Sequence, residues 1–216
     1  MGKWCRREGC DLRRHSIKIK QMKEISILKI TSDVAAVLGE PTVLDCQPEE
    51  SPFPGLEDRV RIEAPEVLSV LIKEADVSGI SDAKPMTGDV VVEADGVVRL
   101  PLTSDFLRLV SVRMSDWRRP VNEITGRGES KYSFQASEFS GVCGNPSRPV
   151  AIIGYDKGGN RCLELHSSGA GARLSYCLYL PAPVVSQTDT LEVPDAMYES
   201  LIKRIASNIA EDAQNS

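Results

Sequence analysis

The spacing of the apolar residues changes twice along this chain, and that change constrains the fold more than any other feature. Near both ends the apolar residues recur every three or four positions, which places them on one face of a helix. In the middle of the chain they recur every second position, which is typical of strands. An element with one apolar face must bury it against another element. The pattern therefore predicts an α+β fold, with N- and C-terminal helices packed as a helical layer and an inserted antiparallel β domain.

The terminal helices are predicted from their apolar stripes and from the residues that end them. Residues 26–38 form the first helix, which Gly39 ends, because glycine readily adopts the left-handed conformation at a helix C-terminus. The β-branched residues at its start leave a strand followed by a helix open as an alternative. A second helix covers residues 56–75, and Pro65 either begins its second half or kinks it. Pro194 suits the first position of the C-terminal helix, whose stripe recurs every four residues.

The charge distribution separates the beginning of the chain from the rest. We interpret residues 1–21 as a basic extension that is disordered or non-native, with a basic arm that binds nucleic acid or a partner as the alternative. This extension holds 7 Lys/Arg and 2 Asp/Glu, whereas residues 22–216 hold 19 and 29. The body of the protein is therefore strongly acidic, which argues against a polyanion-binding body. We expect the helical domain in residues 22–88 with 190–216, and the β domain in residues 89–189.

The central part of the chain predicts short strands joined by tight turns. A hairpin is expected around Ala94-Asp95-Gly96, between residues 90–93 and 97–100, since Asp-Gly suits the positive φ of such turns. Residues 106–114 form a further strand. A meander is expected from three strands, over residues 150–155, 161–166 and 173–180.

The glycine-rich residues 118–147 are expected to form long loops with a short strand near residues 132–135. The register of the meander would place Cys162 and Cys177 directly opposite each other, which is near the range that a disulfide needs. The alternative, which we favour, is a pair of reduced, buried cysteines. The N-terminal residues lack the apolar segment of an export signal, and a reducing compartment is then expected.

Motifs for known catalytic chemistry are absent from the sequence. His166 precedes two serines and could act as a general base, but we favour a solvent-facing residue at a hairpin tip. Glu49 and Glu50 lie in a proline-rich stretch and are interpreted as a solvated charge run. We therefore predict no catalytic, cofactor-binding or metal-binding residues, and we do not expect an enzyme. No apolar run approaches the roughly 18 residues that a membrane span needs.

Arginine and aromatic residues gather in and after the strand over residues 106–114. This composition is typical of the residues that dominate protein–protein contacts, although a cation–π stack that locks a corner is an equal alternative. The interaction candidates in the β domain are Arg108, Arg113, Trp117, Arg118 and Arg119. Three further candidates lie in the last helix, where we favour a place in the core: Tyr198, Leu201 and Ile205.

Four short sequences occur in an order that resembles one known family. They are LPLTSDFLRL over residues 100–109, RPVA over residues 148–151, YLP over residues 179–181 and VPDAMYESLI over residues 193–202. With the terminal helices and the central β part, they resemble the head–tail connector adaptor proteins of tailed phages and prophages. The resemblance covers residues 22–212.

The resemblance implies a virion structural protein without catalysis. Such a protein would form a homo-oligomeric ring, often of twelve copies, that joins the portal protein to the tail proteins. DNA would pass through its lumen without specific binding, and an acidic surface suits this passage because like charges repel. The protein would lie in the virion, and in the cytoplasm of the bacterial host during assembly. The alternatives are a monomeric β-sandwich module that binds a carbohydrate or peptide through residues 122–148, and a hydrolase centred on His166.

Overall fold

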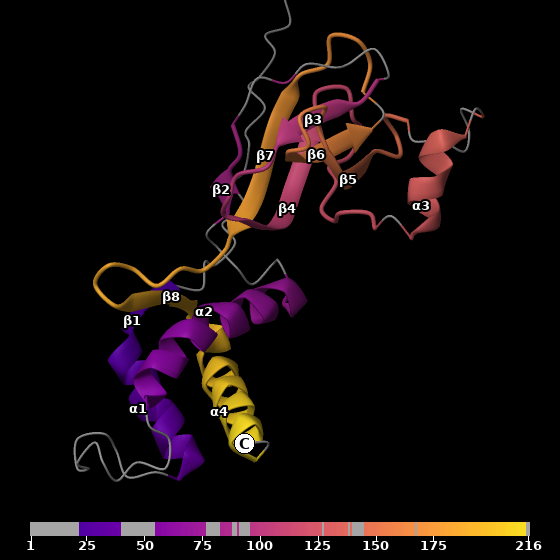
Figure 1. Cartoon of the computed structure of the whole chain (residues 1–216). Coiled ribbons are helices and arrows are strands. Elements are labelled where there is room, and N and C mark those ends of the chain that lie inside the picture. The colour runs from indigo at the N-terminus through magenta and orange to yellow at the C-terminus, as the bar shows by residue number, and fades with distance from the viewer. Residues whose placement is uncertain are drawn as a thin grey trace, which may run out of the picture.

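The fold is α+β, with two hydrophobic cores one above the other (Figure 1). The computed structural model describes residues 22–39, 55–76, 83–87, 90, 96–126, 128–137, 139, 145–166 and 168–214. The basic extension and Glu49-Glu50 lie outside the described residues. No helix in these ranges is long and apolar enough to cross a membrane.

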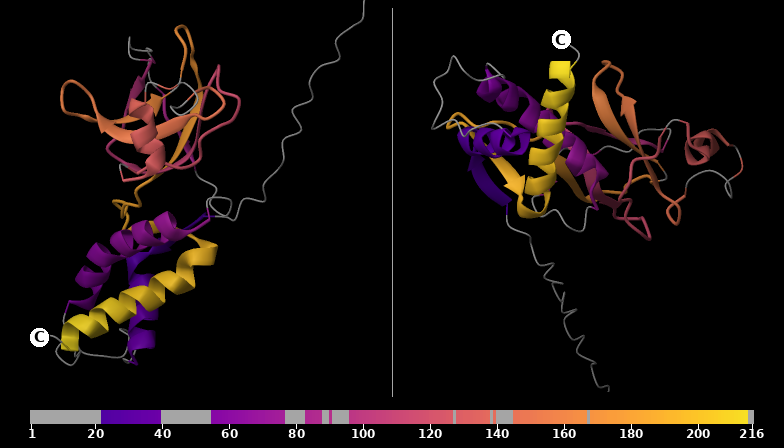
Figure 2. Two further views of the ribbon diagram at one scale, coloured as in Figure 1. Left: turned by 90° about the vertical axis from the view of Figure 1, so that its right-hand side faces the viewer. Right: turned by 90° about the horizontal axis from the view of Figure 1, so that it is seen from below.

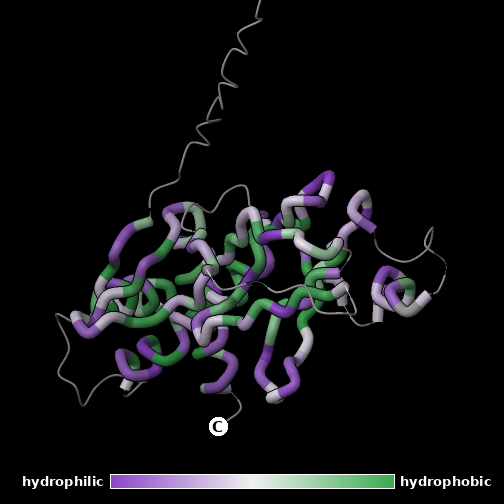
Figure 3. The backbone as a smooth tube through the Cα atoms, turned by 90° about the horizontal axis from the view of Figure 1, so that it is seen from above, coloured by the Kyte–Doolittle hydropathy of each residue, from purple (hydrophilic) through white to green (hydrophobic). Residues whose placement is uncertain are grey.

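The lower part, here called the helical lobe, contains three helices and a two-stranded sheet. The helices are α1 (Ile27–Leu38), α2 (Leu56–Glu74) and α4 (Tyr198–Gln214). The strands β1 (Met22–Ser26) and β8 (Thr190–Pro194) pair antiparallel. Together these elements enclose one core, in which Ile30, Leu68 and Leu201 are fully buried. In Figure 3 the hydropathy alternates along the helices, as expected for elements with one buried face.

The ends of the helices follow local rules only in part. Ser26 caps α1, since its hydroxyl accepts a hydrogen bond from the Lys29 backbone N–H at 3.2 Å, and Gly39 ends the helix with φ at 78°. The strand that precedes α1 confirms the strand-then-helix alternative. Pro65 lies inside one uninterrupted helix α2. Pro194, however, ends β8 rather than beginning α4, because the pairing with β1 extends through that residue. A short 3-10 turn, η3 (Asp195–Met197), follows it.

The upper part, here called the β lobe, contains two three-stranded antiparallel sheets. One has the order β2-β7-β4, formed by Lys84–Pro85, Leu174–Pro181 and Phe106–Met114. The other has the order β3-β6-β5, formed by Val98–Pro101, Arg161–His166 and Val150–Tyr155. Their inner faces enclose the second core, around Leu100, Leu109 and Leu163.

The expected meander is only half correct. Strands β5 and β6 form the predicted hairpin, but β7 pairs with β4 and β2 instead of β6, so the chain crosses from one sheet to the other after residue 166. Cys162 therefore lies opposite Gly154 and Pro101, and Cys177 lies opposite Val112 in the other sheet. The expected opposition of the two cysteines is wrong, and both are buried thiols that form no disulfide with each other.

The segment near residues 132–135 differs from the expectation, and the predicted hairpin around residues 94–96 is described only in part. The strand expected near residues 132–135 is helical, as α3 (Ser130–Ser133) followed by the 3-10 turn η2 (Phe134–Ala136). The Glu129 carbonyl accepts backbone hydrogen bonds from Tyr132 and Ser133 there, which closes a helical turn and leaves no ladder partner. In the predicted hairpin, residues 91–95 lie outside the described ranges. Strand β3, which follows them, pairs with β6.

The two lobes meet where β4 and β7 approach α2 (Figure 2). Arg108 of β4 donates through Nη1 to the carbonyl oxygens of Ile72 at 2.8 Å and Ala75 at 2.5 Å. These carbonyls belong to the C-terminal end of α2, which lacks intrahelical partners for its last carbonyl groups. Leu180 at the end of β7 belongs to the core of the helical lobe. Leu107 and Val110 of β4 also pack against that core, so apolar contacts and the Arg108 hydrogen bonds together join the lobes.

Candidate interaction surfaces

Three of the predicted contact residues lie inside the protein. Trp117 is 1% exposed and belongs to the core of the β lobe, and its backbone N–H closes a turn on the Met114 carbonyl at 3.2 Å. Leu201 and Ile205 of α4 are fully buried in the helical lobe. These side chains cannot reach a partner at the surface of the folded chain. Trp117 and the two α4 residues therefore form core, and for the α4 residues this is the place that their spacing indicates.

Tyr198 and Arg108 are half-buried and already bonded within the chain. The Tyr198 hydroxyl donates to Oδ2 of Asp33 at 2.5 Å and so ties α4 to α1. Burial and the nearby Asp33 carboxylate raise the pKa of Tyr198. Burial also raises the pKa of Asp33, but hydrogen bonds from Lys29 and Tyr198 outweigh it and leave this pKa below its usual value. Arg108 caps α2 as described above. Both side chains therefore stabilise the fold through hydrogen bonds within the chain.

The remaining candidates belong to a cluster of arginines at one end of the β lobe. We call it the arginine pole, and it consists of Arg113, Arg118, Arg119, Arg148 and Arg173. Backbone contacts bring its segments together: the Arg118 N–H donates to the Pro146 carbonyl at 2.8 Å, and the Ser115 N–H donates to the Arg173 carbonyl at 2.8 Å. Arg148 and Arg173 are not among the residues predicted from the sequence, because they lie far along the chain and carry no local motif.

The arginine pole lies at the end of β4 and β7 that faces away from the helical lobe. Phe106 pairs with Pro181 at the near end of this ladder, and Met114 pairs with Leu174 at the far end. Arg118, Arg119, Arg148 and Arg173 are exposed, and Arg113 is half-buried.

The arginines of the pole are not neutralised by neighbouring acids. Across the described part of the chain, no ion pair joins any of these five side chains to a carboxylate. Asp116 lies within the pole, but its Oδ2 accepts a hydrogen bond from the Gly169 backbone N–H at 2.7 Å. The described structure therefore leaves the charges of these five arginines without carboxylate partners at one end of an acidic protein.

The two lobes carry charges of opposite sign. Residues 83–188, which include the β lobe, hold 12 Lys/Arg and 10 Asp/Glu. Residues 22–82 with 189–216, which include the helical lobe, hold 7 and 19. Charge is thus unevenly distributed along the molecule, with an acidic lobe at one end and the arginine pole at the other.

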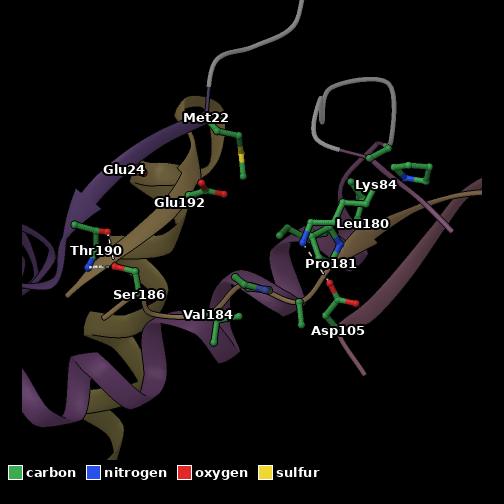
Figure 4. A pocket seen from close by; sticks show the side chains of 15 residues that line it. Met22, Glu24, Lys84, Asp105, Leu180, Pro181, Val184, Ser186, Thr190 and Glu192 are labelled. Carbon is green, nitrogen blue, oxygen red and sulfur yellow. Dashed lines mark hydrogen bonds and ion pairs between the residues drawn. The ribbon is translucent and has the colours of Figure 1, made fainter. Parts of the chain in front are cut away.

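A groove with a volume of about 550 Å³ separates the lobes (Figure 4). Leu180 and several prolines line it, and Glu24 and Glu192 lie directly opposite each other in the β1–β8 pair along its wall. On the other side, Lys84 Nζ lies 3.3 Å from Asp105 Oδ2. Hydrogen bonds from Thr103, Tyr179 and Lys84 hold the pKa of Asp105 below its usual value. The ion pair fixes β2 and β4 at the junction.

The surroundings of His166 differ from those of a hydrolase. Its Nε2 lies 3.6 Å from Oε2 of Glu164 on the same strand. Ser168 is buried, and its hydroxyl has no hydrogen-bond partner; the structure shows no bond from His166 to it. No group of three or more His, Cys, Asp or Glu suited to a metal ion occurs among the described residues. Among the described residues, the geometry of His166 and Ser168 does not support catalysis, and Ser167 lies outside the described residues.

Comparisons with known proteins do not identify a family for this chain. No family model matches this chain, and no curated protein matches it.

Proposed function

We propose that this protein is a virion structural protein, an adaptor that joins the portal of a phage to its tail as a homo-oligomeric ring. The opposite charge of its two lobes is the observation that carries the proposal. A ring requires two different surfaces on each copy that fit each other, because a heterologous contact repeats from copy to copy until it closes. Surfaces of opposite charge on one chain meet that requirement.

The two-lobed shape also supports an adaptor. Each lobe has its own core, and Arg108 fixes one lobe against the other. A subunit of this kind presents an acidic helical surface to one partner and a β surface to another. In this proposal the partners are the portal protein and the tail proteins, DNA crosses the lumen without specific binding, and the protein performs no catalysis. It would lie in the virion, and in the host cytoplasm during assembly.

The direct test mixes the purified protein with portal rings encoded by the neighbouring genes. We expect the portal to gain a layer of this protein, visible by electron microscopy and as an increase in sedimentation coefficient. A capsid protein from the same phage serves as the control for non-specific association. A protein that stays monomeric beside every neighbouring portal contradicts the adaptor and favours the monomeric binding module.

A further inference from the structure

We propose that the arginine pole of one copy binds the outer face of α2 in a neighbouring copy, and that this contact repeats around the ring. The inference rests on the proposed function and deepens it by naming the two surfaces. The pole supplies five arginines that have no carboxylate partner among the described residues. The outer face of α2 supplies the matching acids together with an apolar surface.

The outer face of α2 is a stripe of alternating acidic and apolar side chains. Asp58, Ile62, Glu66 and Val70 follow each other at steps of four, so they form one row along the helix. Ile62 is 65% exposed and Val70 is 37% exposed. Within the described ranges no ion pair engages Asp58 or Glu66. Neither acid belongs to the ion-pair network of its own lobe.

Other acids of α2 have cationic partners, which sets this stripe apart. Glu57 pairs with Arg61 at 3.0 Å, and Glu74 pairs with Arg204 at 3.0 Å. The stripe is therefore an acidic surface that the described part of the chain leaves open, with large apolar side chains between the charges. Exposed apolar surface rimmed by polar residues marks protein–protein contact sites, and Ile62 and Val70 place such surface between the acids of the stripe.

The chemistry of the pole fits this stripe. A guanidinium group can donate two parallel hydrogen bonds to one carboxylate, which makes arginine the preferred partner for buried or interfacial acids. Tyr176 lies directly opposite Arg113 in the β4–β7 ladder and is 38% exposed. Its ring offers the pole an apolar surface for Ile62 and Val70. The arginine pole and the α2 stripe are thus complementary in charge, and both also present apolar side chains.

The contact has to form between copies. Arg108 touches the C-terminal end of α2, and Arg113 lies five residues further along β4, about 17 Å away at the usual rise of a strand. The rest of the pole follows beyond Arg113. Asp58 and Ile62 lie in the first half of α2, toward its other end. The pole therefore cannot reach the stripe of its own chain, and the contact is heterologous, as a ring requires.

A nucleic acid is the other anionic ligand that an arginine cluster could bind. The charge of the chain favours a protein surface: the helical part holds 19 Asp/Glu against 7 Lys/Arg, and such a lobe repels a polyanion. It attracts the arginines of another copy. Binding of duplex DNA is accordingly an outcome of the test.

The test exchanges the charges of the two surfaces in the full-length protein. One variant carries Arg118→Glu with Arg119→Glu, the second carries Asp58→Lys with Glu66→Lys, and the third carries all four changes. Ring assembly on purified portal is measured by sedimentation and electron microscopy, and circular dichroism confirms that each variant is folded. We expect each two-site variant to weaken assembly at least about tenfold, because close charge pairs at interfaces couple strongly. The four-site variant should regain most of the assembly.

Matched controls apply the same charge changes elsewhere. Lys131→Glu with Arg161→Glu alters exposed cations of the β lobe outside the pole, and Glu24→Lys with Glu192→Lys alters exposed acids outside the stripe. Both controls should assemble within about threefold of the unchanged protein, since their charges lie outside the contact.

The outcomes separate this inference from the proposed function. Rings that form normally with either two-site variant, or a four-site variant that fails to recover, overturn the α2 contact and leave the adaptor in place. A loss of affinity for duplex DNA in the arginine variant, with assembly unchanged, overturns it in favour of a nucleic-acid surface. An unchanged protein that never assembles on the portal overturns the adaptor and this contact together.

Discussion

At the scale of single residues, Arg108 is the clearest case of a side chain whose role depends on tertiary position. It donates from β4 to two carbonyls at the C-terminal end of α2. A cation there also interacts favourably with the negative end of the helix dipole. Its removal leaves those carbonyls without a partner at the junction of the lobes.

Arg108→Ala should therefore lower the free energy of unfolding by about 1.5–3 kcal/mol, the range for hydrogen bonds to charged groups. Urea denaturation followed by circular dichroism measures this change. Arg118→Ala is the matched control, because Arg118 is exposed and forms no ion pair in the described structure; its effect should stay within about 0.5 kcal/mol. Equal effects of the two substitutions would contradict the capping role.

The buried cysteines lead to a prediction about reactivity. Burial raises the pKa of the Cys177 thiol to about 12, so almost none of it is the reactive thiolate near neutral pH. In the native protein at pH 8, a thiol reagent should leave Cys162 and Cys177 unlabelled for hours, and both should react quickly in urea. Peptide mapping by mass spectrometry identifies the labelled positions. Rapid native labelling of Cys177 would show that the β lobe opens readily.

Sequence patterns predicted which residues are buried better than they predicted which residues form hydrogen bonds between distant segments. The four-residue spacing in α4 was enough to place Leu201 and Ile205 in the core, because burial follows from which side of a helix a residue occupies. The roles of Arg108 and Tyr198 depend on partners distant along the chain, at Ile72, Ala75 and Asp33. No local spacing contains that information.

At the scale of elements, α2 contains an internal proline. Pro65 has no backbone N–H to donate within the helix. Pro65→Ala should restore that hydrogen bond and raise the free energy of unfolding by about 1–3 kcal/mol, since a mid-helix proline costs about 3 kcal/mol relative to alanine. Thermal and urea unfolding test this, with the exposed loop residue Pro120→Ala as the control. A loss of stability would show that α2 needs the proline for its packing.

The two-stranded sheet of β1 and β8 contains a pair of like charges. Glu24 and Glu192 lie directly opposite each other and are exposed, an arrangement that destabilises a ladder. Glu192→Lys should raise the free energy of unfolding by about 0.2–1 kcal/mol, and the gain should shrink in 1 M salt because exposed charges are screened. Glu192→Gln should give a smaller gain. A destabilised Glu192→Lys variant would contradict this pairing.

The elements that sequence failed to place are those whose partners lie in another part of the chain. Strand β8 pairs with β1 across more than 160 positions, and Pro194 alone suggested a helix start there. After β6 the chain crosses to the other sheet, although strands that follow each other usually pair. Alternation of apolar residues identifies a strand, but it does not identify the neighbour of that strand.

At the scale of the whole molecule, the net charge does not reveal that the positive and negative side chains are separated between the two lobes. The acidic body indicated by the sequence is the sum of an acidic helical lobe and a β lobe that concentrates its arginines at its far end. Composition could not reveal this, because Arg113 and Arg173 belong to segments that are distant along the chain and that the β4–β7 pairing brings to the same end of the β lobe. The fold places these charges on two surfaces of opposite sign, and these surfaces can attract each other between copies.

The ion pairs and hydrogen bonds that join elements also predict how the whole molecule responds to acid. The pKa values of Asp105, at the junction of the lobes, and of Asp33, between α1 and α4, lie below the usual value of 3.8. A carboxyl whose pKa is lower in the folded state stabilises the protein above its unfolded pKa, and this contribution is lost as the pH falls through the folded pKa. Glu63 acts in the opposite direction, because burial raises its pKa.

The free energy of unfolding should consequently fall between pH 5 and pH 2, and Asp105→Asn should reduce the size of that fall. The variant is expected to be less stable than the unchanged protein at pH 5, and the difference should narrow as the solution becomes more acidic, because protonation of Asp105 removes from the unchanged protein the charge that the Asn variant already lacks. Urea denaturation at pH 5, 4, 3 and 2 measures this difference in the free energy of unfolding. Asp58→Asn is the control, since Asp58 is exposed and has no ion-pair partner in the described structure. A parallel acid response in Asp105→Asn and the unchanged protein would mean that the junction of the lobes does not depend on this carboxylate.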